Sequence, residues 1–109
     1  MNAEPQILRC NISHVEGPGI KIQRGSHAKI QLCEITECTT GIHSVSGDPD
    51  IFMNMIRKNK ENGIHIITKN GLRSDAVVRY NWVEKNLEDG IAVEGEENYA
   101  RIEKNHHIC

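Results

Sequence analysis

Length, composition and charge narrow the class of protein at once. The chain has 109 residues, which suit a single domain, and its formal net charge of −2 excludes the overall basic field of nucleic-acid binders. No apolar run approaches the roughly 18 residues of a membrane span, and the first ten residues lack the basic-then-apolar layout of a signal peptide.

The apolar residues are of the kind that strands prefer. The sequence contains 15 Ile and 6 Val but only 4 Leu and 5 Ala. β-branched side chains lose χ1 freedom in a helix and pack well on a pleated surface. Ten Asn and nine Gly, spread along the chain, supply turn residues at short intervals. The composition therefore predicts an all-β protein.

Two patterns repeat along the chain with the same period. In the first, a β-branched residue is followed three positions later by Cys or Asn and, in most repeats, by an aliphatic residue two positions further on. The repeats are Ile7 with Cys10 and Ile12, Ile30 with Cys33 and Ile35, Ile51 with Asn54 and Ile56, Val78 with Asn81 and Val83, and Ile102 with Asn105 and His107. In the second, a Gly-Ile pair opens a short strand at Gly19, Gly41, Gly63 and Gly90. The repeats of each pattern start 21 to 27 residues apart, and the two patterns interleave.

This period predicts a parallel β-helix of about five coils, each of about 21–27 residues. A leucine-rich repeat has a similar period, but four Leu in the whole chain cannot fill its fixed Leu sites. We expect three short strands in each coil: one over Ile30, Gln31 and Leu32, one around Ile35, and one that begins with the Gly-Ile pair. Residues 1–4 are expected to form an N-terminal tail and residues 5–109 the coils.

Stacked coils should place like residues in columns through the interior, because neighbouring strands lie about 4.8 Å apart. The column at one corner is expected to contain Cys10, Cys33, Asn54, Asn81 and Asn105, and an aliphatic column beside it Ile12, Ile35, Ile56 and Val83. A buried Asn amide in such a column can bond the amide of the next coil. Asn59 and Asn86 follow at the next corner. We expect the Gly before each Ile to adopt a backbone conformation that a Cβ would oppose.

The order I-x-x-N-x-I, then K-N, then x-x-G-I-x-I resembles the repeat of pectate-lyase-like right-handed parallel β-helix proteins. The resemblance covers residues 5 to 109. Within that group the sequence is most similar to eukaryotic intracellular forms, namely the F-box proteins that carry β-helix repeats and the SHC SH2-domain-binding protein. The resemblance implies the fold, and by analogy with the F-box proteins it implies substrate recognition, although no F-box segment is present in this sequence. It implies no single activity, because one fold serves many functions.

No catalytic constellation emerges in this register, so we expect a protein that is not an enzyme and that uses no cofactor and no metal. Cys33 and Cys38 are spaced unlike any closed zinc motif. Cys10 and Cys33, one coil apart, allow either a disulfide or two reduced thiols that face inward, and we favour the second. Reduced cysteines and the absence of a leader predict an intracellular, cytoplasmic protein.

Two surfaces are candidates for binding a protein partner. His43 and His65 each follow a Gly-Ile pair and should point outward on one strip with Lys21. The third coil is about four residues longer than the others, and the extra residues fall in 68–75, where Lys69, Leu72 and Arg73 would form the tip of a protruding loop. The plainer interpretations are a solvated sheet surface and a neutral insertion.

We therefore expect a protein-binding or scaffold module. The alternative is a carbohydrate-binding or carbohydrate-processing segment, against which the small number of aromatic residues argues: Phe52, Tyr80, Trp82 and Tyr99. No nucleic-acid or membrane partner is expected. The coil pattern begins at Ile7 and continues to the last residues without a capping helix, so we also expect either part of a longer solenoid or a chain that associates end to end.

Overall fold

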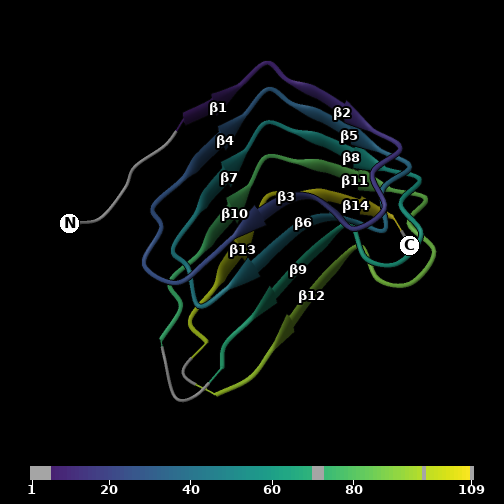
Figure 1. Ribbon diagram of the computed structural model, residues 1–109. Helices are drawn as coiled ribbons and strands as arrows, with labels where there is room; N and C mark the ends of the chain where they lie inside the picture. The colour runs from purple at the N-terminus through teal and green to yellow at the C-terminus, as the bar shows by residue number, and fades with distance from the viewer. Residues whose placement is uncertain (1–5, 70–72, 97, 109) are drawn as a thin grey trace.

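Three parallel sheets wind into one solenoid in the computed structural model (Figure 1). The structure describes residues 6–69, 73–96 and 98–108. Each of the first four coils passes through one strand of every sheet before the chain steps to the next coil, and the fifth coil contributes described strands to two of the sheets. The described residues include no helix. The predicted all-β parallel β-helix is confirmed.

Fourteen short strands build the three sheets, and each sheet takes every third strand along the chain. Sheet A contains β1 (Gln6–Leu8), β4 (Lys29–Gln31), β7 (Asp50–Phe52), β10 (Val77–Arg79) and β13 (Arg101–Glu103). Sheet B contains β2 (Asn11–Ser13), β5 (Glu34–Thr36), β8 (Met55–Arg57), β11 (Trp82–Glu84) and β14 (His106–Ile108). Sheet C contains β3 (Pro18–Ile22), β6 (Thr40–Val45), β9 (Ile64–Ile67) and β12 (Ile91–Glu94).

The strand register equals the sequence period. In sheet B, Ile35 lies opposite Ile12 on one side and Ile56 on the other, and Val83 follows Ile56. These four residues form the predicted aliphatic column. Because the side chains of a strand alternate between its two faces, the middle residue of each three-residue strand in the second, third and fourth coils is buried and its two neighbours are more exposed.

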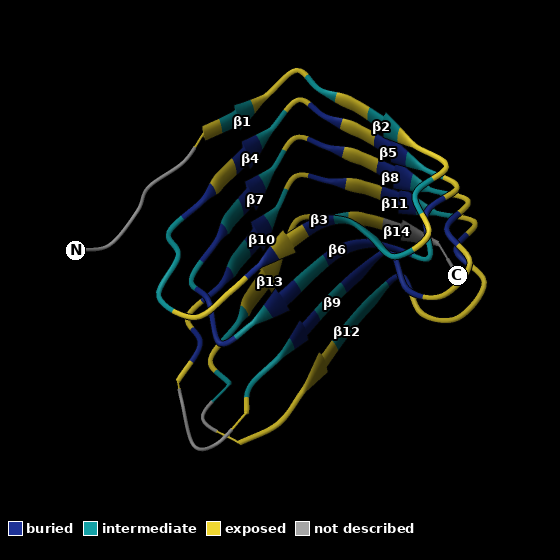
Figure 2. Ribbon diagram, viewed as in Figure 1, coloured by how far each residue is buried: buried dark blue, intermediate teal, exposed yellow. Residues whose placement is uncertain are grey.

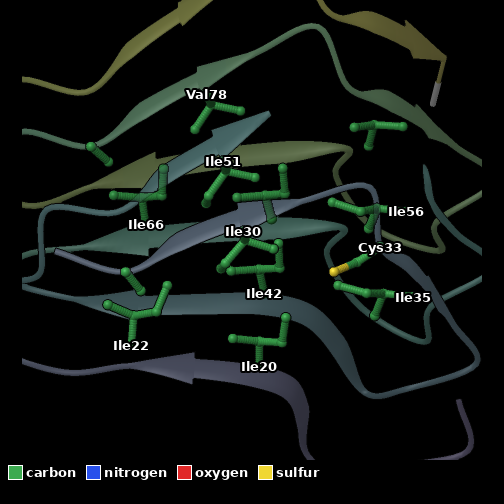
Figure 3. Packing of buried hydrophobic residues seen from close by; sticks show 14 of the residues in the cluster. Ile20, Ile22, Ile30, Cys33, Ile35, Ile42, Ile51, Ile56, Ile66 and Val78 are labelled. Atoms are coloured by element: carbon green, nitrogen blue, oxygen red, sulfur yellow. The ribbon is translucent and has the colours of Figure 1, made fainter. Parts of the chain in front are cut away.

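The core is therefore a stack of branched aliphatic side chains (Figure 3). Ile30, Ile51 and Val78 of sheet A and Ile35 and Ile56 of sheet B are fully buried. Each such side chain contributes roughly 1.5–3 kcal/mol relative to exposure in water.

A ladder of Asn side chains joins the coils at the bend between sheets A and B. The Asn54 amide nitrogen donates to the Ile30 carbonyl and to Asn81 Oδ1, both at 3.0 Å. Asn81 repeats the arrangement with the Ile51 carbonyl and Asn105 Oδ1, also at 3.0 Å. Each Oδ1 also accepts the backbone N–H at the same position of the preceding coil, as Asn54 Oδ1 does from Cys33 at 2.9 Å.

A second ladder stands at the bend between sheets B and C. The Asn59 amide nitrogen donates to Asn86 Oδ1 at 2.8 Å, and the Cys38 N–H donates to Asn59 Oδ1 at 3.0 Å. Both ladders lie where the sequence pattern predicts them. Buried amides cost free energy unless they are bonded, so these networks stabilise one register only.

The residue before each ladder position adopts a left-handed backbone conformation. At the first bend these residues are Arg9, Leu32, Met53, Tyr80 and Lys104, with φ between 54° and 59°; at the second they are His14, Glu37, Lys58 and Lys85, with φ between 53° and 59°. This conformation costs about 1 kcal/mol or more for a residue with a Cβ. The expectation that Leu32 ends a strand is wrong, because β4 stops at Gln31 and Leu32 turns the corner.

The prediction for the glycines that precede Ile needs correction. Gly19, Gly41 and Gly63 do not have a positive φ. They are required by close packing instead: a Cβ on Gly41 would lie 2.5 Å from the Gly63 carbonyl oxygen and 2.7 Å from Ile56 Cγ2. The backbone of sheet C thus approaches the next coil too closely for any side chain at these positions.

Removal of one rung of the first ladder should destabilise the fold strongly. Asn81→Ala leaves the Asn54 N–H and the Ile51 carbonyl buried without their partner, so we expect the free energy of unfolding to fall by roughly 3 kcal/mol. Cys33→Ala, in the same column, should cost only about 1 kcal/mol because it removes a weak donor. Urea unfolding followed by circular dichroism measures both. Equal losses would contradict a structural role for the amide ladder.

Ser44 is a buried polar residue whose side chain makes no hydrogen bond. Ser44 stands between Ile22 and Ile66 in an inward column of sheet C, is fully buried, and its hydroxyl has no hydrogen-bond partner in the structure. Ser44→Ala removes an unsatisfied buried group, so we expect it to raise the free energy of unfolding by about 1 kcal/mol. Loss of stability in the same urea titration would instead indicate a bonded hydroxyl.

Candidate functional site

The predicted histidine strip exists on the outer face of sheet C. Lys21 of β3 lies opposite His43 of β6, and His43 lies opposite His65 of β9, so the three side chains stack from coil to coil. The two imidazole rings are stacked, with centroids 5.1 Å apart. Ala92 of β12 follows in the same column.

The two histidines differ in their partners. His65 Nε2 lies 3.3 Å from Glu94 Oε2, whereas His43 Nε2 is buried without a hydrogen-bond partner. Burial lowers the pKa of His43 below its usual value, and the nearby positive charges of His65, Lys21 and Lys69 lower it further. The strip is therefore held together by stacking, and it favours a neutral His43 at physiological pH.

The predicted loop is only partly described. Leu72 lies outside the described residues. Lys69 is exposed, and its N–H donates to the Ser46 hydroxyl at 3.1 Å. Arg73 contacts its own chain: Nε and a terminal nitrogen donate to the Asp75 carboxylate at 2.8 and 3.0 Å, and the guanidinium lies 4.5 Å from the centre of the Tyr99 ring. The charge of Lys69 is near enough to His43 to help lower the pKa of that histidine, and Arg73 is engaged within its own chain.

The described parts of the chain contain no group of three or more His, Cys, Asp or Glu arranged to hold a metal ion, and no helix there could cross a membrane. Cys10, Cys33 and Cys38 are free thiols, so the disulfide alternative for Cys10 and Cys33 is not the one that the structure adopts. Burial raises the pKa of the Cys33 thiol, which makes it a weak nucleophile. Cys109 lies outside the described residues.

A surface that the sequence did not reveal lies at the bend between sheets A and B. We name it the corner groove. One wall is formed by the left-handed residues Arg9, Leu32, Met53 and Tyr80, and the other by the first residues of the sheet B strands, Asn11, Glu34, Met55 and Trp82. Between the walls the floor is formed by Cys10, Cys33 and Asn54 of the first ladder. Figure 2 shows exposed positions along this bend beside the buried strand centres.

The corner groove gathers exposed apolar side chains. The exposed fraction is 44% for Leu32, 49% for Met53, 37% for Met55, 50% for Tyr80 and 43% for Trp82. These five come from three consecutive coils and are half of the large apolar side chains that are exposed in the described residues. The second bend has the same backbone but carries only polar side chains in its left-handed column. The apolar groove is therefore not a general property of the fold.

Trp82 contacts other side chains of the chain. Its ring stacks on the His106 imidazole at 3.9 Å between centroids. A hydrogen bond from the Trp82 side chain to the Glu84 carboxylate is the main cause that lowers the pKa of Glu84, and Arg57 of the preceding coil lies 3.5 Å from the same carboxylate. One face of the Trp82 ring is thus covered within the chain, and 43% of the residue remains exposed.

The sequence pattern did not predict the corner groove, and the reason is physical. Leu32, Met53 and Tyr80 precede the Cys or Asn of the repeat, where the sequence offers no Gly that would signal a positive φ. If these residues ended strands, as expected for Leu32, their side chains would belong to a sheet and would not form a separate surface at the bend. The available signal was the column itself: the position before each ladder residue is occupied by Leu, Met and Tyr in three consecutive repeats.

Comparison with known families identifies the repeat. The family model described as a right-handed β-helix region matches residues 2–107. The chain belongs to this family of right-handed β-helix proteins. The β-helix matches no curated protein and no solved structure. Its family includes both enzymes and non-enzymes, so membership fixes the fold and leaves the activity to be argued from the surface.

The lowered pKa of His43 should make the β-helix less stable in acid. A neutral His43 contributes stability above the unfolded-state pKa of about 6.5, and this contribution is lost as the pH falls toward the lower folded-state pKa. We expect the urea midpoint to drop between pH 8 and pH 5.5, and to drop less in His43→Gln, which cannot be protonated. An equal drop in both proteins would contradict the assignment.

Proposed function

We propose that this β-helix is a protein-binding module whose contact surface is the corner groove. The observation that carries the proposal is the set of five exposed apolar side chains on one groove of an otherwise polar bend surface. Apolar side chains that gather on one exposed surface of a soluble protein often mark an interaction site. Trp, Tyr and Met, which supply four of the five, are the residue types enriched in protein interfaces.

The fold supports this function because the groove is rigid before any partner arrives. The ladder amides hold its floor, and hydrogen bonds between coils fix its backbone, such as Leu32 N–H to the Met53 carbonyl at 3.1 Å. Binding to a preorganised surface loses little conformational entropy. Tyr80 and Trp82 are large aromatic residues in contact with neighbours, and Trp and Tyr are enriched among the interface residues that contribute most affinity.

The aromatic geometry favours a protein over a sugar. A sugar ring stacks on an open aromatic face, but the Trp82 ring has His106 against one face. The Lys104 ammonium lies 5.8 Å from the centre of the Tyr80 ring. Side chains stacked in columns present edges outward, and such edges suit the irregular apolar surface of a protein.

The histidine strip is a weaker candidate for the same function. It lies on sheet C, apart from the corner groove (Figure 1). His65 is bonded to Glu94, and the two imidazoles pack on each other, so much of their binding capacity is used within the chain. We assign it a secondary role, with Lys21 and Lys69 available to an acidic edge of a partner.

Substitutions at left-handed positions allow a clean test. Asn tolerates the left-handed conformation, so Met53→Asn with Tyr80→Asn removes two groove side chains while the backbone is kept. We expect this double variant to weaken partner binding at least about thirtyfold, as the loss of one strong interface residue does. Affinity capture from a lysate of the source organism, with the partner then purified and titrated by calorimetry, measures the effect.

The matched control is Lys58→Asn with Lys85→Asn. These residues have the same backbone conformation at the second bend, outside the corner groove. The control should retain the partner that the groove variant loses. A partner retained equally by both variants would place its contact elsewhere, and a glycan-array signal abolished by Trp82→Ala would replace the proposal with carbohydrate binding.

A further inference from the structure

We propose that the corner groove binds one amphipathic α-helix of a partner protein, with acidic residues near both ends of the apolar face of that helix. This inference rests on the protein-binding function proposed above and adds the chemistry of the partner. Three features of the groove carry it: its occupied backbone groups, its spacing along the solenoid, and the charges at its ends.

Along the middle of the groove, backbone N–H groups are already occupied and are not available to an extended peptide. The Leu32 N–H donates to the Met53 carbonyl at 3.1 Å, and the Trp82 N–H donates to the Asn54 carbonyl at 2.8 Å. Peptides that bind as added strands gain affinity from main-chain hydrogen bonds, which require an open sheet edge. A helix satisfies its own backbone and needs only side-chain contact. The groove therefore suits a helix.

The spacing of the groove also matches a helix better than a strand. Leu32, Met53 and Tyr80 occupy successive coils, so their positions repeat about every 4.8 Å. One turn of an α-helix rises about 5.4 Å, whereas side chains on one face of a strand repeat about every 6.7 Å. Over the two steps from Leu32 to Tyr80, a helix drifts out of step by about 1 Å and a strand by about 4 Å. Met53 and Met55 are flexible enough to absorb the smaller mismatch.

Positive charge brackets the apolar wall. Arg9 and Lys104 are exposed and stand at the two ends of the column that contains Leu32, Met53 and Tyr80. Four coil steps separate them, about 19 Å, which a helix of about 13 residues covers. Acidic side chains near the two ends of such a helix would meet these cations. Exposed pairs add little affinity each, but they fix the register of the helix in the groove.

Peptide display on the purified protein tests the inference. A random peptide library is selected on the wild-type chain and counter-selected on Met53→Asn with Tyr80→Asn. We expect enriched peptides to place apolar residues at i, i+4 and i+7, with acidic residues toward both ends. On titration with the protein, such a peptide should gain helical circular dichroism, which is readily assigned because the described protein residues contain no helix. A proline in its centre should abolish binding.

Charge reversal tests the ends of the groove separately. Arg9→Glu with Lys104→Glu should weaken the selected peptide about tenfold. Lys58→Glu with Lys85→Glu makes the same change of charge at the second bend, at two positions with the same left-handed backbone conformation. This pair should leave the affinity unchanged. Equal weakening by both pairs would show a general charge effect and overturn the assignment of the two ends.

The outcomes separate this inference from the proposed function. Groove-dependent peptides with alternating apolar residues, or peptides that tolerate the central proline, overturn the helix while protein binding stands. A selection that yields no peptide able to distinguish wild type from the groove variant overturns the inference, and the capture experiment then judges the function by itself. Concentration-dependent dimers that the groove variant abolishes, measured by light scattering, would replace the helix with a second copy of this chain.

Discussion

The stacking of identical positions from coil to coil is the constraint on which the structure depends. Asn54, Asn81 and Asn105 bond each other, the backbone N–H of the preceding coil and a carbonyl of sheet A, so a shift of one residue would leave several buried polar groups without partners. The aliphatic columns oppose such a shift as well, because it would turn their inward Ile side chains outward, but only the amides require specific bonding partners. Polar bonds thus select the register, and aliphatic burial supplies most of the stabilisation.

The interior could be predicted from the sequence because an inward position has few acceptable residues. Ile12, Ile35, Ile56 and Val83 repeat visibly, and the structure places them opposite one another. The same holds for the two Asn ladders. A buried site accepts a narrow range of size and polarity, so its pattern survives in a single sequence.

The surface could not be predicted to the same extent. Leu32, Met53 and Tyr80 turn the first bend in a conformation that favours Gly or Asn, and only the surrounding coils impose it on them. The role of Gly41 was misjudged for a related reason, because the crowding comes from Gly63 and Ile56, residues distant in sequence. The pairing of Arg73 with Asp75 depends on local geometry that the repeat does not specify.

The connection between β9 and β10 has a wider consequence. This segment is longer than its counterparts, yet Val77 pairs with Asp50, and Val78 with Ile51, in the same register as every other coil. Length added there stays outside the ladder. Residues can therefore be inserted or deleted at this position during evolution, and a recognition element gained or lost, without a change in the register of the solenoid.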